Sequence, residues 1–359
     1  MNRGLRWGLG AVLAACVAIL IRAPARTTGR DLVADELIVA TSGGLIQDVG
    51  RQTLWGPAAR HLGVAVREES FDNGYQLLRL QSASGRVSLD VVELPSFLAM
   101  KGYHEGMIAP LDYGVIGTGG FSPRTSPPYC IGMLSASWVM GWNTDHFGAN
   151  PPLSWADFWD VRRFPGRRGA QVGAEAQLEI ALLADGVAPN DVYPTLSRPG
   201  GIARAIHKWE QLRPHIDVWW SSGSQLAQLM KNGELDLAIG WNGRFEQVIA
   251  TGSPVRYTYS GGILTTDCWA VPTAAPHRLL AMRMIGEMVK AEAQARFASA
   301  IKYGPANAGA YATGLLPGDL ARKLPTHPAN LALQLPEDDE WWAQHSTEAE
   351  RAFDEMRSK

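Results

Sequence analysis

The sequence predicts an α/β protein with two strand–helix units, and three observations favour this fold class. Short apolar strands alternate with amphipathic segments between residues 37 and 94, which is the pattern of a parallel sheet covered by helices. The alternation starts again at residue 137, after a stretch at 114–132 that is rich in Gly and Pro. The chain has 359 residues, 46% of them hydrophobic, which is enough for roughly two domains with apolar cores.

The first unit begins with an apolar strand over residues 37–41, followed by the turn Ser42-Gly43-Gly44. The elements expected next are a helix over 45–61, a strand over 64–66, a helix over 74–82 and a strand over 88–94. Ligands bind beyond the carboxyl ends of parallel strands, so this turn lies at the expected binding edge. Its N–H groups at a helix start would suit an anion, although a simple tight turn explains them as well.

The second unit is expected to begin with a strand over residues 137–142. Ser154 has the pattern of an N-cap for a short helix over 155–159, with Asp157 completing a capping box. The elements expected next are helices over 175–184 and 202–212, a helix from Ser224 to Lys231 and a strand over 235–241. After Tyr257 the expected elements are a Gly-Gly turn, a strand over 268–271 and one long helix over 279–301.

The N-terminus predicts export. Two arginines precede an apolar run over residues 9–21, and Ala23-Pro24-Ala25 has the form of a cleavage site. The run is shorter than the roughly 20 residues that a membrane-spanning helix needs. Residues 1–25 are therefore interpreted as a cleaved signal peptide, and the mature chain is expected in the periplasm. Lipidation at Cys16, which ends a lipobox-like string, is less favoured.

Two cysteines remain after this cleavage, Cys130 and Cys268. An exported protein could join them in a disulfide. Their spacing in the sequence does not show that they are close in space, so two buried free thiols are the expectation.

The sequence lacks the common catalytic and cofactor-binding motifs. It contains no phosphate-binding loop, no strand-linked Gly-x-Gly-x-x-Gly and no Gly-x-Ser-x-Gly nucleophile elbow. The eight His residues are scattered, and neither Cys130 nor Cys268 has a metal-ligand neighbour. A net charge of −2 is not the basic character of a nucleic-acid-binding protein. We therefore expect a binding protein rather than an enzyme, with no cofactor, no metal and no nucleic-acid partner.

Several unusual strings resemble, in order and spacing, the extracellular solute-binding proteins of ABC importers, of the spermidine/putrescine type. These strings are Ser154–Asp160, Phe164–Arg168, Val218–Gly223, Gly233–Asp236, Ile239–Arg244 and Tyr303–Asn307. The resemblance covers residues 35–345 and implies a two-lobed, type II periplasmic-binding fold with the ligand in a cleft between the lobes. It also implies capture of a polyamine (spermidine or putrescine) or a related small cationic solute, and delivery to an ABC permease in the inner membrane. We expect the protein to be a monomer.

The expected division of the chain combines this resemblance with the strand–helix pattern. The segments are 1–25 as signal peptide, 31–134 as the first part of lobe 1, 135–255 as lobe 2, and 256–359 as the return to lobe 1 plus C-terminal helices.

The resemblance assigns ligand-binding roles to three residues. Trp241 matches a Trp that stacks on the ligand, Asp267 an acid that pairs with an ammonium, and Tyr303 a Tyr before the Pro-x-Asn string. Each also has a purely structural interpretation, Trp241 and Tyr303 as packing residues and Asp267 as a strand-end cap. A buried ammonium needs a carboxylate partner, which favours the ligand role for Asp267.

The sequence departs from the family's pattern at several positions. Thr265 stands where the family has an aromatic residue, and Ser42-Gly43 where it has a Trp. Glu175 is the candidate for a second carboxylate, and a solvated helix start explains it equally well. If Ser42 and Gly43 bind an anion, an amino-acid-like or zwitterionic solute fits better than a polyamine. The sequence is also compatible with a thiamine-like cation or a metal chelate as the solute, with a sensor ectodomain and, less favoured, with an enzyme on the same fold.

Overall fold

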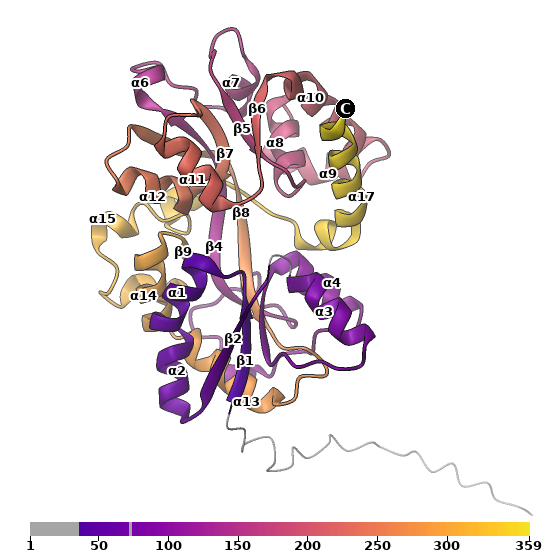
Figure 1. Ribbon diagram of the computed structural model, residues 1–359, viewed down its shortest axis with the longest axis vertical. Coiled ribbons are helices and arrows are strands. Elements are labelled where there is room, and N and C mark those ends of the chain that lie inside the picture. The colour runs from indigo at the N-terminus through magenta and orange to yellow at the C-terminus, as the bar shows by residue number, and fades with distance from the viewer. Residues whose placement is uncertain (1–35, 72–73) are drawn as a thin grey trace, which may run out of the picture.

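The structure is a computed structural model that describes residues 36–71 and 74–359. The expected signal peptide, with Cys16, lies outside the described residues. Figure 1 shows two halves, one above the other, which are joined by the long strands β4 (Ile131–Asn143) and β8 (Val255–Ala270). The two-lobed α/β architecture expected from the sequence is confirmed. Within the described ranges, the structure contains no helix that is both long enough and apolar enough to cross a membrane.

One sheet runs through both halves, in the order β2-β1-β3-β8-β4-β7-β5-β6, with β9 beside β4 and β10 beside β8. β1 pairs in parallel with β2 and β3, and β5 pairs in parallel with β6 and β7. The antiparallel pair of β4 and β8 joins these two sets. The remaining strands are β1 (Glu36–Thr41), β2 (Ala65–Ser70), β3 (Val91–Pro95), β5 (Arg168–Gln171), β6 (Ile216–Trp220), β7 (Leu237–Trp241), β9 (Gly304–Pro305) and β10 (Leu335–Pro336).

We propose that the two halves are the two lobes, and that the chain crosses between them inside β4 and β8, near the paired residues Ser135 and Thr266. Both strands are long enough to contribute to the sheet of each half (Figure 1). The carboxyl ends of the parallel strands in the two halves therefore face one another across the junction.

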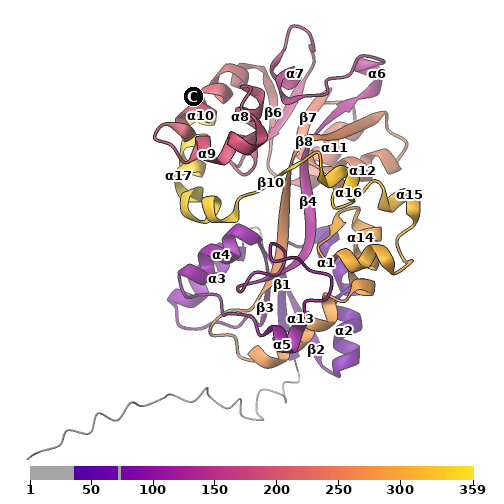
Figure 2. The ribbon, with the colours of Figure 1, turned by 180° about the vertical axis from the view of Figure 1, so that it is seen from behind.

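Helices cover the sheet in each half (Figures 1 and 2). The lower half contains α1 (Gly44–Thr53), α2 (Trp55–Leu62), α3 (Gly74–Ala83), α4 (Ser96–His104), α5 (Tyr113–Ile116), α13 (Arg278–Met288) and α14 (Ala291–Ile301). The upper half contains α6 (Thr144–Phe147), α7 (Trp155–Trp159), α8 (Gln177–Ala184), α9 (Val192–Leu196), α10 (Gly201–Leu212), α11 (Gly223–Lys231), α12 (Asn242–Ala250) and α17 (Asp339–Ser358). The short helices α15 (Gly318–Ala321) and α16 (Pro328–Leu331) lie between α14 and β10 in the chain.

Two helix starts test the capping predictions. Ser154 Oγ accepts the Asp157 N–H at 3.2 Å, and the Asp157 carboxylate accepts the Ser154 N–H at 3.0 Å, so the capping box is confirmed. At α11 the N-cap is Ser222, which accepts the Gln225 N–H, and not Ser224 as expected. Ser222 has the extended backbone that an N-cap needs, whereas Ser224 already lies in the helix.

Two helices that were expected to be continuous are interrupted. The helix over 45–61 breaks at Leu54, where Trp55 packs so closely on Gly50 that a Cβ there would lie 2.0 Å from the indole ring. The helix over 279–301 breaks into α13 and α14, because Lys290 has an extended backbone. The apolar periodicity on which both predictions were based gives no sign of a break that tertiary packing imposes.

The Gly-Gly turn expected after Tyr257 is instead an irregularity inside β8. The pairing of β8 with β4 shifts register opposite Trp138 and Met140, and Gly261 has a left-handed φ of 70°. The carbonyl of Gly261 accepts the indole N–H of Trp155 at 2.7 Å. The strand therefore continues through the glycines rather than reversing.

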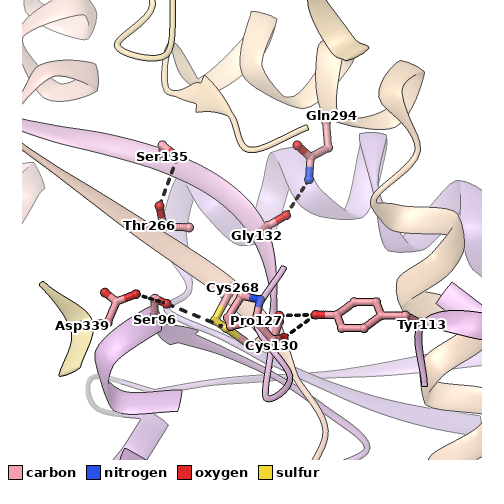
Figure 3. Close-up of a disulfide and its surroundings, with 10 residues drawn as sticks. All are labelled: Ser96, Tyr113, Pro127, Cys130, Gly132, Ser135, Thr266, Cys268, Gln294 and Asp339. Carbon is pink, nitrogen blue, oxygen red and sulfur yellow. Dashed lines mark hydrogen bonds between the residues drawn. A yellow bond between two sulfur atoms is a disulfide. The ribbon is translucent and has the colours of Figure 1, made fainter. Parts of the chain in front are cut away.

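Cys130 and Cys268 form a disulfide (Figure 3), so the expectation of free thiols is wrong. Cys268 lies in β8, and Cys130 lies directly before β4. The antiparallel register pairs Gly132 of β4 with Cys268, which brings the two sulfur atoms together across 138 residues of chain. That register depends on long-range pairing and cannot be deduced from the spacing of the cysteines.

Candidate ligand-binding site

Three carboxylates from three separate elements meet where the halves join. Glu93 lies in β3, Asp267 in β8, and Glu175 in the loop before α8. Burial, followed by the charge of Asp267, raises the pKa of Glu93 and of Glu175 to about 8. Burial raises the pKa of Asp267 to about 6. Carboxylates that face one another in a poorly solvated place gain most from a bound cation.

The register of the sheet explains how Glu93 and Asp267 come together. β3 and β8 are antiparallel neighbours, with Glu93 opposite Trp269 and Pro95 opposite Asp267. The two acids are therefore close on adjacent strands. Their distance from one another in the sequence does not indicate this proximity.

Ser42 holds one of these carboxylates. Its backbone N–H donates to Glu93 Oε2 at 2.9 Å, and its hydroxyl donates to Glu93 Oε1 at 3.1 Å. Both hydrogen bonds lower the pKa of Glu93, against the larger effect of burial. Gly43 follows with a left-handed φ of 77°, and a Cβ there would lie 3.2 Å from Ser70. The Ser42-Gly43 turn thus lies beside the acids, and the Ser42 N–H already has an anionic partner.

Three tryptophans form an aromatic cluster next to the acids. Trp138 of β4 is paired with Trp241 of β7 in the sheet, and their ring centroids are 4.5 Å apart. Trp220 of β6 stands edge-on to Trp241 at 5.2 Å. Trp138 and Trp220 are fully buried, whereas Trp241 is partly exposed and packs against the cores of both halves. The ring of Trp241 is thus the one that a ligand could reach.

The indole N–H of Trp138 faces Glu175, whose pKa it lowers. Trp138 Nε1 is buried and completes no hydrogen bond of ordinary geometry with another described residue. The group is therefore placed to donate to Glu175 or to a molecule that enters beside it.

Tyr303 lies close to charges of opposite sign. Burial raises its pKa, which Asp267 raises further and Arg244 lowers. Arg244 is in the first turn of α12. Its Nη1 donates to Gln247 Oε1 at 3.4 Å, its Nε is buried without a hydrogen-bond partner, and it forms no ion pair with a carboxylate of the described chain. A cation and one acid of the cluster, Asp267, therefore lie close to the same tyrosine.

Asn242 fixes the position of this part of the site. Its side-chain oxygen accepts the Ser137 N–H at 3.0 Å, and its amide donates to the Lys302 carbonyl at 3.0 Å. Asn242 thereby ties the start of α12 to β4 and to the end of α14. Gly243 allows close approach, because a Cβ there would lie 2.5 Å from the ring of Tyr303.

Backbone strain marks the same place. Ala176 (φ 63°) and Lys302 (φ 64°) are the two residues other than Gly that have positive φ in the described ranges. Ala176 directly follows Glu175, and Lys302 directly precedes Tyr303. Left-handed backbone at residues with a Cβ is unfavourable and is concentrated at functional sites, so both positions support the placement of the site here.

The structure places Asp267, Glu175, Tyr303, Trp241 and Ser42 around this junction. Gly43 lies in the same turn, but its N–H donates to Thr41 Oγ1 at 3.4 Å rather than to an acid.

Sequence reasoning missed the residues Glu93, Trp138 and Arg244. Glu93 lies near the end of a strand of the parallel set, and Arg244 ends the string 239–244. These positions in the sequence were weak indications that the two residues belong to the binding site. In the portion of the chain that the structure describes, no group of three His, Cys, Asp or Glu side chains could hold a metal ion.

Comparisons with known proteins agree with the two-lobed fold. A family model described as bacterial extracellular solute-binding protein matches residues 58–325. The chain is 35% identical over 318 residues to the gamma-aminobutyric acid-binding protein of Pseudomonas aeruginosa, covering 88% of this chain and 89% of that one. It is 24% identical over 192 residues to the spermidine/putrescine-binding periplasmic protein of Escherichia coli, covering 53% and 52%. Among solved structures, the PBP MotA from A. tumefaciens in complex with glucopine has a TM-score of 0.84 at 34% identity, covering 90% of this chain and 99% of that one.

Proposed function

This chain belongs to the bacterial extracellular solute-binding protein family, and we propose that its solute is a short ω-amino acid of the γ-aminobutyrate (GABA) type. The family consists of substrate-binding proteins of ABC transporters. They bind small molecules and deliver them to a membrane permease, and they are not enzymes. We base the choice of solute on the charges that the site leaves unpaired.

The observation that carries the proposal is that Arg244 and Asp267, which have opposite charges, both lie close to Tyr303. An ω-amino acid has a carboxylate at one end and an ammonium at the other. In the proposed pose the carboxylate pairs with Arg244, whose planar guanidinium suits a carboxylate. The ammonium lies among Asp267, Glu175 and Glu93, where its charge compensates the buried acids.

Trp241 has the position to cover the middle of such a solute. Its partly exposed ring lies near Arg244 in the chain and against Trp138 and Trp220 in space. The ring face can pack on methylene groups and attract a nearby ammonium.

A diamine is the less favoured solute, although the acids alone would suit it. Its second ammonium would have to approach Arg244, and two cations without an acid between them repel one another. The relative named for GABA is also more similar over more of the chain than the relatives named for spermidine and putrescine.

We propose that the protein acts in the periplasm by closure of its two lobes. A solute that touches Arg244 on α12 and Glu93 on β3 makes its full set of contacts only when the two halves are together. Such a solute shifts the population toward the closed state, and we propose that a permease recognises this state.

Calorimetric titration of the purified protein tests the choice of solute. The ligands are GABA, putrescine and butyrate, which have similar length and differ in their end groups. We expect GABA to bind more tightly than the other two. Tighter binding of putrescine would replace this proposal with the polyamine one, and binding of none of the three would refute both.

The Arg244→Gln variant tests whether the carboxylate of the solute binds at Arg244. A hydrogen bond to a charged group is worth about 1.5–3 kcal/mol, so the GABA affinity should fall roughly tenfold to 100-fold while any weak putrescine binding persists or improves. The matched control is Arg256→Gln, because Arg256 is an exposed arginine of β8. Equal affinities of Arg244→Gln and the parent protein would remove Arg244 from the site.

A further inference from the structure

The C-terminal helix α17 is firmly attached to the upper half. The indole N–H of Trp342 donates to Glu179 of α8 at 2.5 Å, and Glu350 accepts the Ala174 N–H at 3.0 Å. Phe353 packs edge-on against Trp209 of α10, with ring centroids 5.5 Å apart. Figures 1 and 2 both show α17 beside α9 and α10.

The same helix contacts α4, which lies in the lower half. Ser96 Oγ, at the start of α4, donates to Asp339 Oδ2 at 2.7 Å (Figure 3). One turn further along, Lys101 Nζ donates to Ser346 Oγ at 3.2 Å and to Thr347 Oγ1 at 3.1 Å. Hydrogen bonds thus join two successive turns of α4 to the N-terminal half of α17.

Apolar packing fills the space between these hydrogen bonds. The rings of Phe97 of α4 and Trp342 of α17 are 5.8 Å apart. Phe97 is buried in the core cluster that otherwise belongs to the upper half. Ser96, Trp342 and Ser346 are also buried, so the centre of the contact is dry, whereas Thr347 at its edge is exposed.

The chain reaches this contact by a third crossing between the halves. β10 pairs with β8, and the Glu337 N–H donates to the Leu264 carbonyl at 2.9 Å. Arg124 of the lower half donates to the Glu337 carbonyl. The start of α17 is therefore held beside the strands that join the halves.

We propose that the α4–α17 contact is a clasp that stabilises the closed arrangement of the lobes independently of the solute. The clasp consists of Ser96, Phe97 and Lys101 on one side and Asp339, Trp342, Ser346 and Thr347 on the other. Its contacts join residues of different halves, so they are lost when the halves separate. The solute then has to supply less of the free energy of closure, and the apparent affinity rises with the fraction of closed protein.

The double variant Ser96→Ala/Lys101→Met tests the clasp, since it removes the hydrogen-bond donors and keeps the aliphatic stem of Lys101. The matched control is Lys231→Met, at an exposed lysine of α11. Small-angle X-ray scattering of the unliganded proteins measures how open they are, and titration with GABA measures affinity. A melting curve distinguishes loss of the clasp from general loss of stability.

We expect the double variant to have a larger radius of gyration without ligand, or an affinity for GABA that is about fivefold weaker or more, as the loss of such hydrogen bonds predicts. Its radius of gyration at saturating GABA should equal that of the parent protein. A radius of gyration and an affinity that both match Lys231→Met would overturn the proposal. If the parent does not bind GABA, the scattering of the unliganded proteins alone decides, so failure of the clasp is distinguishable from a wrong solute.

Discussion

Ser42 donates two hydrogen bonds to Glu93, one from its backbone at 2.9 Å and one from its hydroxyl at 3.1 Å. These bonds favour the charged form of a carboxylate whose burial favours the neutral form and raises its pKa to about 8. Ser42 therefore controls how much negative charge the site offers to a cation, although it need not touch the solute itself.

The Ser42→Ala variant removes the hydroxyl donor and keeps the backbone donor. Because a hydrogen bond to the charged form lowers a pKa, we expect the pKa of Glu93 to rise further. The affinity for GABA at pH 7 should then fall about fivefold and recover toward the parental value at pH 9. Calorimetry at both pH values measures this change. An exposed serine provides the control as Ser84→Ala, and a loss of affinity that is the same at pH 7 and pH 9 would contradict the interpretation.

The acid cluster predicts that the unliganded protein loses stability as pH rises. The pKa values of Glu93 and Glu175 are raised from 4.5 to about 8. Between those values the folded state binds more protons than the unfolded state, so the free energy of unfolding decreases with increasing pH. The melting temperature should therefore fall between pH 5 and pH 8, and less so when GABA is present.

The Glu175→Gln variant isolates this contribution. Its melting temperature should depend less steeply on pH than that of the parent, because one of the groups that take up a proton on folding is gone. The exposed Glu348→Gln variant should keep the parental slope. A Glu175→Gln slope as steep as the parental one would show that Glu175 does not titrate with the cluster.

Trp241 should contribute to affinity through its exposed ring face. Cation–π and stacking contacts in a partly dry site are worth about 1–2 kcal/mol, so Trp241→Ala should weaken GABA binding roughly tenfold. The matched control is Trp159→Ala. Trp159 lies away from the site, and its indole N–H donates to the Lys208 carbonyl at 3.0 Å. Fluorescence titration compares the two, and a weaker effect at Trp241 than at Trp159 would argue against contact with the solute.

The disulfide predicts sensitivity to reduction. A cross-link that closes a long loop stabilises a protein by about 2–5 kcal/mol. Urea unfolding of the Cys130→Ser/Cys268→Ser variant should show a loss of this size. Reducing agent should destabilise the parent protein by a similar amount and leave the variant unchanged. Equal unfolding midpoints of parent and variant would show that the cross-link adds nothing to stability.

Much of the architecture could be predicted from the sequence because its signals are local. Alternating strands and helices predicted the α/β class, and Ser154 with Asp157 predicted the capping box that the structure contains. Trp241, Asp267 and Tyr303 were assigned through strings that resemble a known family. The structure places all three at the junction of the halves, next to acids and to Arg244.

The remaining features depend on contacts between distant parts of the chain. Glu93 joins the site because β3 pairs with β8, and the disulfide forms because β4 pairs with β8. The break between α1 and α2 depends on the packing of Trp55 on Gly50. None of these has a periodicity or motif of its own, so sequence patterns could not reveal them.

The strands β4 and β8 supply backbone to the sheets of both halves at once. A chimaera in which one half came from a relative would have to join the two sequences inside β4 and β8. Mismatched pairing there would leave backbone N–H and C=O groups of these strands without partners. We therefore expect solute preference to be altered more readily by exchanging individual side chains on an intact framework, with Arg244 of the proposed site as the first choice, than by recombining halves.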